Sequence, residues 1–304
     1  MKSLSHIEPA PYTYDQNKVV ELFTDIIKKR SAPEAWEWLE QNVPRGTDNK
    51  IFNSLFVQLP RKTGRTIIQV NEEEATQLNA ILPLFSITNW PLDRLCRVWL
   101  LLHLATADRP CYITAIDNLF ITAEMNEQVA LYSALPLLAY PEYWRMRCAE
   151  GIRSNIGDVL EAIMYCNPYP SLYLDEAAWN QMILKAFFTE KKVHEIIGLD
   201  ERANGELANI LTDYAHERWA ARRSVNPQLW RCIGRFTNQS NLGDLKRVFN
   251  SQNETEREAA ALALNDAGYA PAKSLLSENP TLKTAVETGR LTWNTLAQKT
   301  SNFL

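Results

Sequence analysis

Hydrophobic residues recur at intervals of three and four along nearly the whole chain, which is the spacing of one face of an α-helix. Strict alternation of apolar and polar residues, which indicates a half-buried strand, is rare. Only residues 66–70 (TIIQV) look extended, and they can equally form a loop. The periodicity therefore predicts an all-α protein. The expected helices cover residues 16–29, 32–41, 49–58, 72–84, 91–106, 111–122, 126–138, 142–152, 155–166, 175–188, 203–223, 227–234, 241–250, 254–267, 271–278 and 281–298.

The connections between these helices are short, and several predicted helices begin with a proline, as at Pro91. Two segments, 127–136 (EQVALYSALP) and 258–264 (EAAALAL), each begin with an acid and are rich in alanine and leucine. Small residues such as alanine let neighbouring helices approach closely. This pattern is typical of an irregular α–α superhelix with HEAT-like helical repeats. The expected organisation is a flexible N-terminal segment, a single helical-repeat domain and a C-terminal helix or tail, at residues 1–14, 15–280 and 281–304 respectively.

The predicted helix 203–223 has an apolar face that continues into arginines. That face is formed by Leu207, Ile210, Leu211 and Tyr214. Further steps of three and four residues lead to Arg218 and Arg222, with Asn204 on the same flank. A guanidinium turned towards a core must meet carboxylates or carbonyls, because an unpaired buried charge is very costly. We therefore expect a polar cluster here, which is either a structural network or a ligand pocket.

Polar residues on two other predicted helices can join this cluster. Asn180 and Lys185 lie in helix 175–188, which is apolar almost all round, while Arg153 and Asn167 flank helix 155–166. Caps, turns and lysine side chains that reach solvent explain such residues equally well. The candidate ligand-binding residues are Arg153, Asn167, Asn180, Lys185, Arg202, Asn204, Arg218 and Arg222. Arginine suits a carboxylate or phosphate because its planar fork can donate two hydrogen bonds at once.

Composition and charge narrow the functional classes. The 304 residues include 46% hydrophobic and 22% charged residues, as in ordinary globular proteins, and only 10 glycines, which disfavours Rossmann-type folds. The net charge of −4 does not favour nucleic acid or an anionic membrane, although residues 218–247 hold seven basic side chains and one acid. The five cysteines have no C-x-x-C spacing, and the longest apolar run is too short to cross a membrane. We expect a cytoplasmic protein.

Motif searches assign no catalytic residue, no metal site and no cofactor. The pair His216-Glu217 lacks the second histidine of a zinc-protease helix, because position 220 is alanine. Phosphate loops, dinucleotide-binding glycine patterns and nucleophile elbows are absent from the sequence. We therefore favour a non-enzymatic protein. Two alternatives stay open: an enzyme that uses Glu217 or Glu161 as acid or base, and, less favoured, a HEAT-like nucleic-acid binder.

Several short motifs, in their order along residues 15–270, resemble the EboA family of bacterial proteins. They are Pro60-Arg61, Glu127-x-x-Ala-Leu-Tyr-x-Ala-Leu-Pro136, Glu150-Gly-x-Arg-Ser-Asn155, Glu161-Ala-Ile with Asn167-Pro-Tyr-Pro170, Trp179-Asn-Gln-Met-x-Leu-Lys185, Gly198-Leu-Asp-x-Arg-Ala-Asn204 and Glu217-Arg-Trp-Ala-Ala-x-Arg223. The resemblance implies a protein encoded beside biosynthetic and prenyltransferase-like enzymes, in an operon linked to the production or traffic of secondary metabolites. It supplies a pathway and possible protein partners from that operon, but no reaction.

Overall fold

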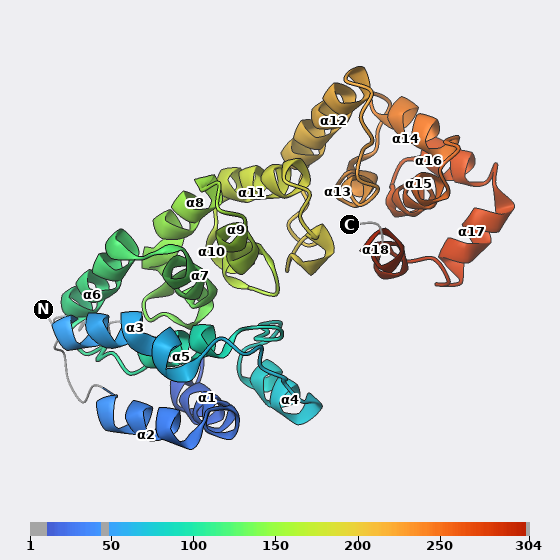
Figure 1. Cartoon of the computed structure of the whole chain (residues 1–304). Coiled ribbons are helices and arrows are strands. Elements are labelled where there is room, and N and C mark those ends of the chain that lie inside the picture. Colours follow the sequence, from blue (N-terminus) through green and yellow to red (C-terminus); the bar gives the residue numbers. More distant parts are fainter. Residues whose placement is uncertain (1–10, 44–48, 302–304) are drawn as a thin grey trace, which may run out of the picture. The chain divides into compact units, whose positions relative to one another are not determined.

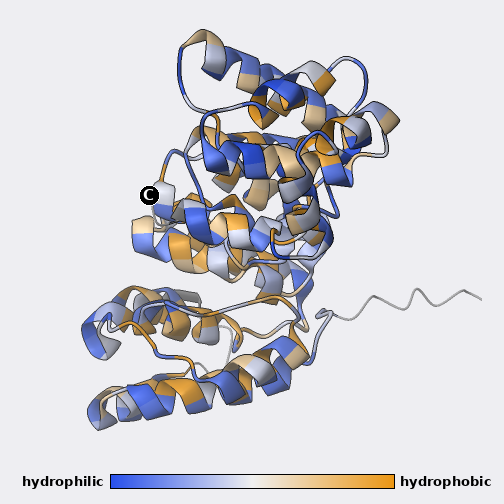
Figure 2. Cartoon of the chain, turned by 90° about the vertical axis from the view of Figure 1, so that its right-hand side faces the viewer, coloured by the Kyte–Doolittle hydropathy of each residue, from blue (hydrophilic) through white to orange (hydrophobic). Residues whose placement is uncertain are grey.

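The computed structural model describes residues 11–43 and 49–301, and in these ranges it contains eighteen α-helices and no strand. The prediction of an all-α protein is confirmed. The chain divides into two compact units, 1–174 and 175–304, each made of short α-helices (Figure 1). Hydrophobic and hydrophilic residues are interspersed along the helices (Figure 2). The single domain 15–280 and the HEAT-like repeat remain predictions.

Unit 1 is organised around α5, in which every residue except Arg94 is buried. This helix packs against α1, α3 and α7, and α7 packs in turn against α9. Near its start, Ile67 forms an isolated bridge with Pro91, so residues 66–70 form a loop with one extended contact. The helices of unit 1 are α1 Gln16–Arg30, α2 Pro33–Asn42, α3 Asn49–Thr63, α4 Glu72–Ile81, α5 Leu92–Leu101, α6 Arg109–Thr122, α7 Met125–Ser133, α8 Arg145–Arg153, α9 Gly157–Met164 and α10 Tyr169–Tyr173, with 3-10 turns at Leu135–Leu137 and Pro141–Trp144.

Unit 2 is organised around α15, whose residues 258–264 are all buried. This helix packs against α13, α14, α16, α17 and α18. Its alanines allow a close approach: a Cβ added at Gly234 would lie 2.8 Å from the Cα of Ala263. The helices are α11 Glu176–Phe188, α12 Gly205–Ala220, α13 Leu229–Ile233, α14 Leu242–Phe249, α15 Glu254–Asp266, α16 Ala270–Leu276, α17 Pro280–Glu287 and α18 Trp293–Ser301, with 3-10 turns at Val193–Glu195 and Gly234–Phe236.

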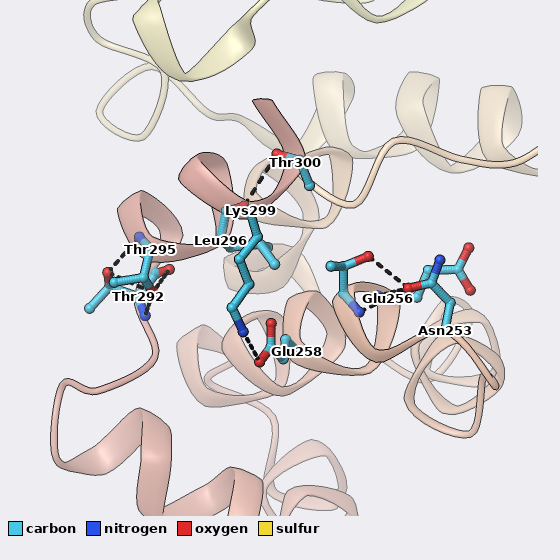
Figure 3. A network of polar contacts seen from close by, with 9 residues as sticks. Asn253, Glu256, Glu258, Thr292, Thr295, Leu296, Lys299 and Thr300 are labelled. Atoms are coloured by element: carbon cyan, nitrogen blue, oxygen red, sulfur yellow. Dashed lines mark hydrogen bonds and ion pairs between the residues drawn. The ribbon is translucent and has the colours of Figure 1, made fainter. Parts of the chain in front are cut away.

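The two ends of the described chain are held by hydrogen bonds. Near the start, Tyr140 N donates to the Pro11 carbonyl at 2.8 Å, and the Tyr14 hydroxyl donates to the Leu137 carbonyl at 2.7 Å. The remainder of the segment predicted to be flexible, residues 1–10, lies outside the described residues. At the other end, Lys299 of α18 bonds the buried Glu258 of α15 at 2.5 Å (Figure 3). The predicted C-terminal helix 281–298 is in fact two helices, α17 and α18.

Candidate functional site

A groove of about 410 Å³ lies beside Arg218 in unit 2. One wall comes from α12, the end of α11 and the loop that follows α12, and the other comes from the start of α15 and Thr300 of α18. Figure 3 shows Asn253 and Glu256 at the start of α15. The lining is apolar at Phe187, Tyr214, Val225 and Pro227, charged at Glu190, Arg218 and Glu256, and polar at Ser224, Asn226, Asn253, Thr255 and Thr300. A cavity of this size is typical of small-molecule sites.

The C-terminal end of α12 positions Arg218. The amide of Arg222 donates to the Trp219 carbonyl at 2.9 Å, and the amide of Arg223 donates to the Arg218 carbonyl at 2.8 Å. These two bonds, together with the left-handed backbone of Arg222, form a Schellman motif at the end of the helix. The loop then folds back, so Arg218 Nε donates to the Ser224 carbonyl at 2.9 Å. Among the residues that the structure describes, the two terminal guanidinium nitrogens of Arg218 have no hydrogen-bond partner.

The prediction that this helix runs to residue 223 is wrong. It ends at Ala220, and Arg222 has left-handed backbone with φ 56°. Arg222 therefore leaves the helical wheel, and its side chain is exposed. Arg218 is half-buried at the edge of the groove instead of being enclosed in a core. The expected inward-facing pair of arginines is thus reduced to one.

Asn180 and Asn204 form a reciprocal amide pair between α11 and α12. Asn204 Nδ2 donates to Asn180 Oδ1 at 2.9 Å, and Asn180 Nδ2 donates to Asn204 Oδ1 at 3.2 Å. Asn204 is also the N-cap of α12, since its Oδ1 accepts from Leu207 N at 2.8 Å, and its Nδ2 reaches the Arg202 carbonyl at 3.2 Å. Arg202 lies over the ring of Trp179, 4.8 Å from the centroid. Burial lowers the pKa of Arg202, against the opposing effect of Glu176 and Asp175. These contacts indicate a structural network.

Lys185 of α11 lines a second groove, of about 480 Å³. That groove is lined by Gln181, Leu184, Lys185, Phe188, Ile210, Asp213, Tyr214 and Glu217. Desolvation lowers the pKa of the Lys185 amine. Tyr214 lines both grooves. Lys185 and Glu217 line only the second groove, whereas Arg218 lines only the first. Successive residues on a helix point about 100° apart, which explains why Glu217 and Arg218 face different spaces.

Arg153 and Asn167 belong to unit 1. Arg153 is the exposed last residue of α8. Asn167 is buried, and its amide donates to the carbonyls of Ala162 at 2.9 Å and Tyr132 at 3.3 Å, while its Oδ1 accepts from Tyr169 N at 3.0 Å. These three bonds hold the turn between α9 and α10. A shared pocket of Arg153 and Asn167 with the arginines of unit 2 stays a prediction.

Glu161, the other proposed acid or base, also lies in unit 1, near Arg94. Burial lowers the pKa of Arg94, and the charges of Asp93, Asp158 and Glu161 oppose that shift. Arg94 in turn lies over the ring of Trp90, 5.5 Å from the centroid. The structure therefore gives Glu161 an arginine neighbour in its own unit.

Three buried charges that lie close together in unit 1 are not among the predicted site residues. Arg97 and Asp93 of α5 are 2% and 3% exposed, and Glu127 of α7 is 7% exposed. Arg97 Nη1 donates to Asp93 Oδ2 at 2.7 Å, its Nη2 lies 3.9 Å from Glu127 Oε1, and its Nε donates to the Phe56 carbonyl at 3.1 Å. The available signal in the sequence was the acid and base at i and i+4, Asp93 and Arg97, within a largely apolar helix.

The basic residues between 218 and 247 are partly neutralised. Arg231 binds Asp200 through two hydrogen bonds of 2.5 Å. Arg247 lies over the ring of Trp219, 4.0 Å from the centroid, and His216 Nε2 is 2.9 Å from Asp244 Oδ1. His216 is exposed, as expected for a surface histidine. The Asp200 carboxylate thus offsets one of the seven basic charges of this window.

In residues 11–43 and 49–301, no group of three or more His, Cys, Asp and Glu side chains is arranged to hold a metal ion. None of the helices in the same ranges is long and apolar enough to span a bilayer.

Comparison with known proteins identifies one family. The family model described as "Metabolite traffic protein EboA" matches residues 19–234, which is more than half of the chain. The match begins in α1 and ends after α13, so it includes Arg218 and the first wall of its groove, while the residues from α15 and α18 lie beyond it. No curated protein and no solved structure matches the chain. The chain belongs to the EboA family of metabolite traffic proteins.

Proposed function

We propose that this chain is a non-enzymatic helical protein that binds a small polar or anionic molecule during the traffic or biosynthesis of a secondary metabolite. It acts in the cytoplasm, as a binding protein or as a scaffold for enzymes of the same pathway. The family name supports metabolite traffic. The pocket and its ligand class are the part that we add to it.

The observation that carries the proposal is the unsatisfied guanidinium of Arg218. Its Nε donates to the Ser224 carbonyl and holds the loop, while its two terminal nitrogens have no hydrogen-bond partner among the described residues, and Arg218 lines a groove that also has apolar residues. An arginine held by one bond, with its fork left open, is ordered in advance for a carboxylate or phosphate. Among the eight predicted ligand-binding residues, Arg218 is therefore the one on which we base the pocket.

The test is a ligand-induced shift in melting temperature. We expect 3-phenylpropionate and phenyl phosphate, each an apolar ring with an anionic group, to raise the melting temperature of the wild type. Arg218→Ala should abolish the rise, while Arg223→Ala, an exposed arginine that does not line the groove, should preserve it. Far-UV circular dichroism checks that both variants stay helical. Equal shifts in Arg218→Ala and wild type would contradict the proposal, as would the absence of any shift.

A further inference from the structure

We infer that the Arg218 groove selects zwitterions: small molecules with an apolar body, one anionic group and one cationic group, as in an aromatic amino acid. This inference rests on the proposed function and narrows its ligand class. It starts from the sign of the lining charges, which are one arginine and two glutamates. A purely anionic ligand would meet Arg218 but would also face Glu190 and Glu256.

The opposite charges of the groove do not neutralise each other. In the part of the chain that the structure describes, Arg218 forms no ion pair within 4.0 Å with Glu190 or Glu256. Both signs are therefore available to a ligand. A molecule that presents a carboxylate to Arg218 and an ammonium to a glutamate satisfies both, whereas a singly charged molecule leaves one sign unpaired or opposed.

Of the two glutamates that line the groove, Glu190 is the one whose carboxylate has no structural role within the described residues. The amide of Glu190 donates to the Phe187 carbonyl at 3.3 Å, and the amide of Lys191 donates to the Ala186 carbonyl at 2.8 Å, so α11 ends in the same motif as α12. Glu190 occupies the left-handed position, φ 55°, where glycine is favoured. Within the described residues its side chain has no hydrogen bond or ion pair. Glycine fits this left-handed position with less strain, so the helix end does not itself require a carboxylate here.

Glu256 has a structural role that Glu190 lacks. It lies in the first turn of α15, where a negative charge favours the helix dipole, and its Oε2 accepts from the Ser251 hydroxyl. We therefore assign the ammonium contact to Glu190 and the carboxylate contact to Arg218. Phe187 and Tyr214 border the same groove and supply the apolar surface between the two charges.

The experiment uses three probes with nearly the same skeleton: L-phenylalanine, 3-phenylpropionate and 2-phenylethylamine. Isothermal titration calorimetry of the full chain at pH 7 should give L-phenylalanine at least a tenfold lower Kd than either singly charged probe. Glu190→Gln should raise the Kd for L-phenylalanine about tenfold and leave that for 3-phenylpropionate unchanged or lower. Arg218→Gln should weaken the binding of both L-phenylalanine and 3-phenylpropionate. Glu254→Gln removes an exposed acid of α15 that does not line the groove, and it should leave the Kd of all three probes unchanged.

The outcomes separate this inference from the proposed function. If 3-phenylpropionate binds as tightly as L-phenylalanine, and Glu190→Gln alters neither, the zwitterion inference is overturned while the Arg218 site stands. If no probe binds, or Arg218→Gln binds all three like the wild type, both proposals fail.

Discussion

Two groups of charges in this protein are built in opposite ways. In unit 1, Arg97 is enclosed with Asp93 and Glu127, and each of its three nitrogens faces an acceptor at 2.7–3.9 Å. In unit 2, Arg218 uses one nitrogen internally and leaves the other two beside a groove. All the nitrogens of the Arg97 guanidinium face acceptors within the protein, whereas two nitrogens of Arg218 can bind another molecule.

The difference shows that charge type alone does not reveal a site. Both arginines lie on helices and beside apolar residues in the sequence, and what separates them is burial together with the supply of protein acceptors. Arg97 is 2% exposed, so removal of its partners would leave a buried, unpaired charge, which is strongly destabilising. Arg218 keeps contact with solvent, so its fork can remain open at little cost.

Removal of one partner from the buried group should have the largest effect. We expect Asp93→Ala to lower the free energy of unfolding by about 3–5 kcal/mol, because the buried Arg97 loses its 2.7 Å partner. The double variant Asp93→Leu/Arg97→Met should recover only part of that loss, since it removes two charges at similar volume but leaves the buried Glu127 without Arg97. Urea denaturation followed by circular dichroism measures both. A loss below about 1 kcal/mol for Asp93→Ala would show that this group is not a paired buried network.

The amide pair between α11 and α12 should have an intermediate effect. Asn180→Ala leaves Asn204 without its partner, and we expect a loss of about 1–3 kcal/mol. Asn209, an exposed residue of α12, is the matched control, and Asn209→Ala should stay within about 0.5 kcal/mol of the wild type. Chemical denaturation of the two variants side by side decides the point. If Asn180→Ala and Asn209→Ala are equally stable, the amide pair does not stabilise the fold.

Glycine at either of the two left-handed helix ends should raise the free energy of unfolding, by less than the losses predicted above. Arg222→Gly and Glu190→Gly each relieve a left-handed residue, φ 56° and 55°, and we expect each to raise stability by about 0.5–1 kcal/mol. The variants should differ in binding, because only Glu190 lines the groove. Thermal unfolding with and without L-phenylalanine separates the two effects. Destabilisation by Arg222→Gly would show that its side chain stabilises the fold.

Much of the fold follows from the sequence. The period of hydrophobic residues predicts most of the helices, and the alanine-rich segment 258–264 is indeed the buried part of α15. The ends of helices are harder to predict. No glycine marks the left-handed turn at Arg222, so the helical period continues past the true end of α12. In the opposite sense, α3 continues through Pro60 to Thr63, beyond its predicted end at residue 58.

The candidate site is less predictable because it depends on which side chains find partners. The wheel that places Arg218 beside Tyr214 is right, since both line one groove. The sequence gives no sign that Asn180 and Asn204 bond each other, or that Lys185 faces a different groove. Glu190 was also not expected in the site, because it lies in a turn after a helix and only the folded chain brings it near Arg218.

The most direct test of the account is calorimetric titration of 3-phenylpropionate into the wild type and into Arg218→Ala. We predict measurable binding to the wild type and none to the variant. The stability of the variant should fall by less than about 1 kcal/mol, since only one partly exposed hydrogen bond to Ser224 is lost. Equal affinity in the two proteins would contradict the claim that Arg218 is held open for a ligand.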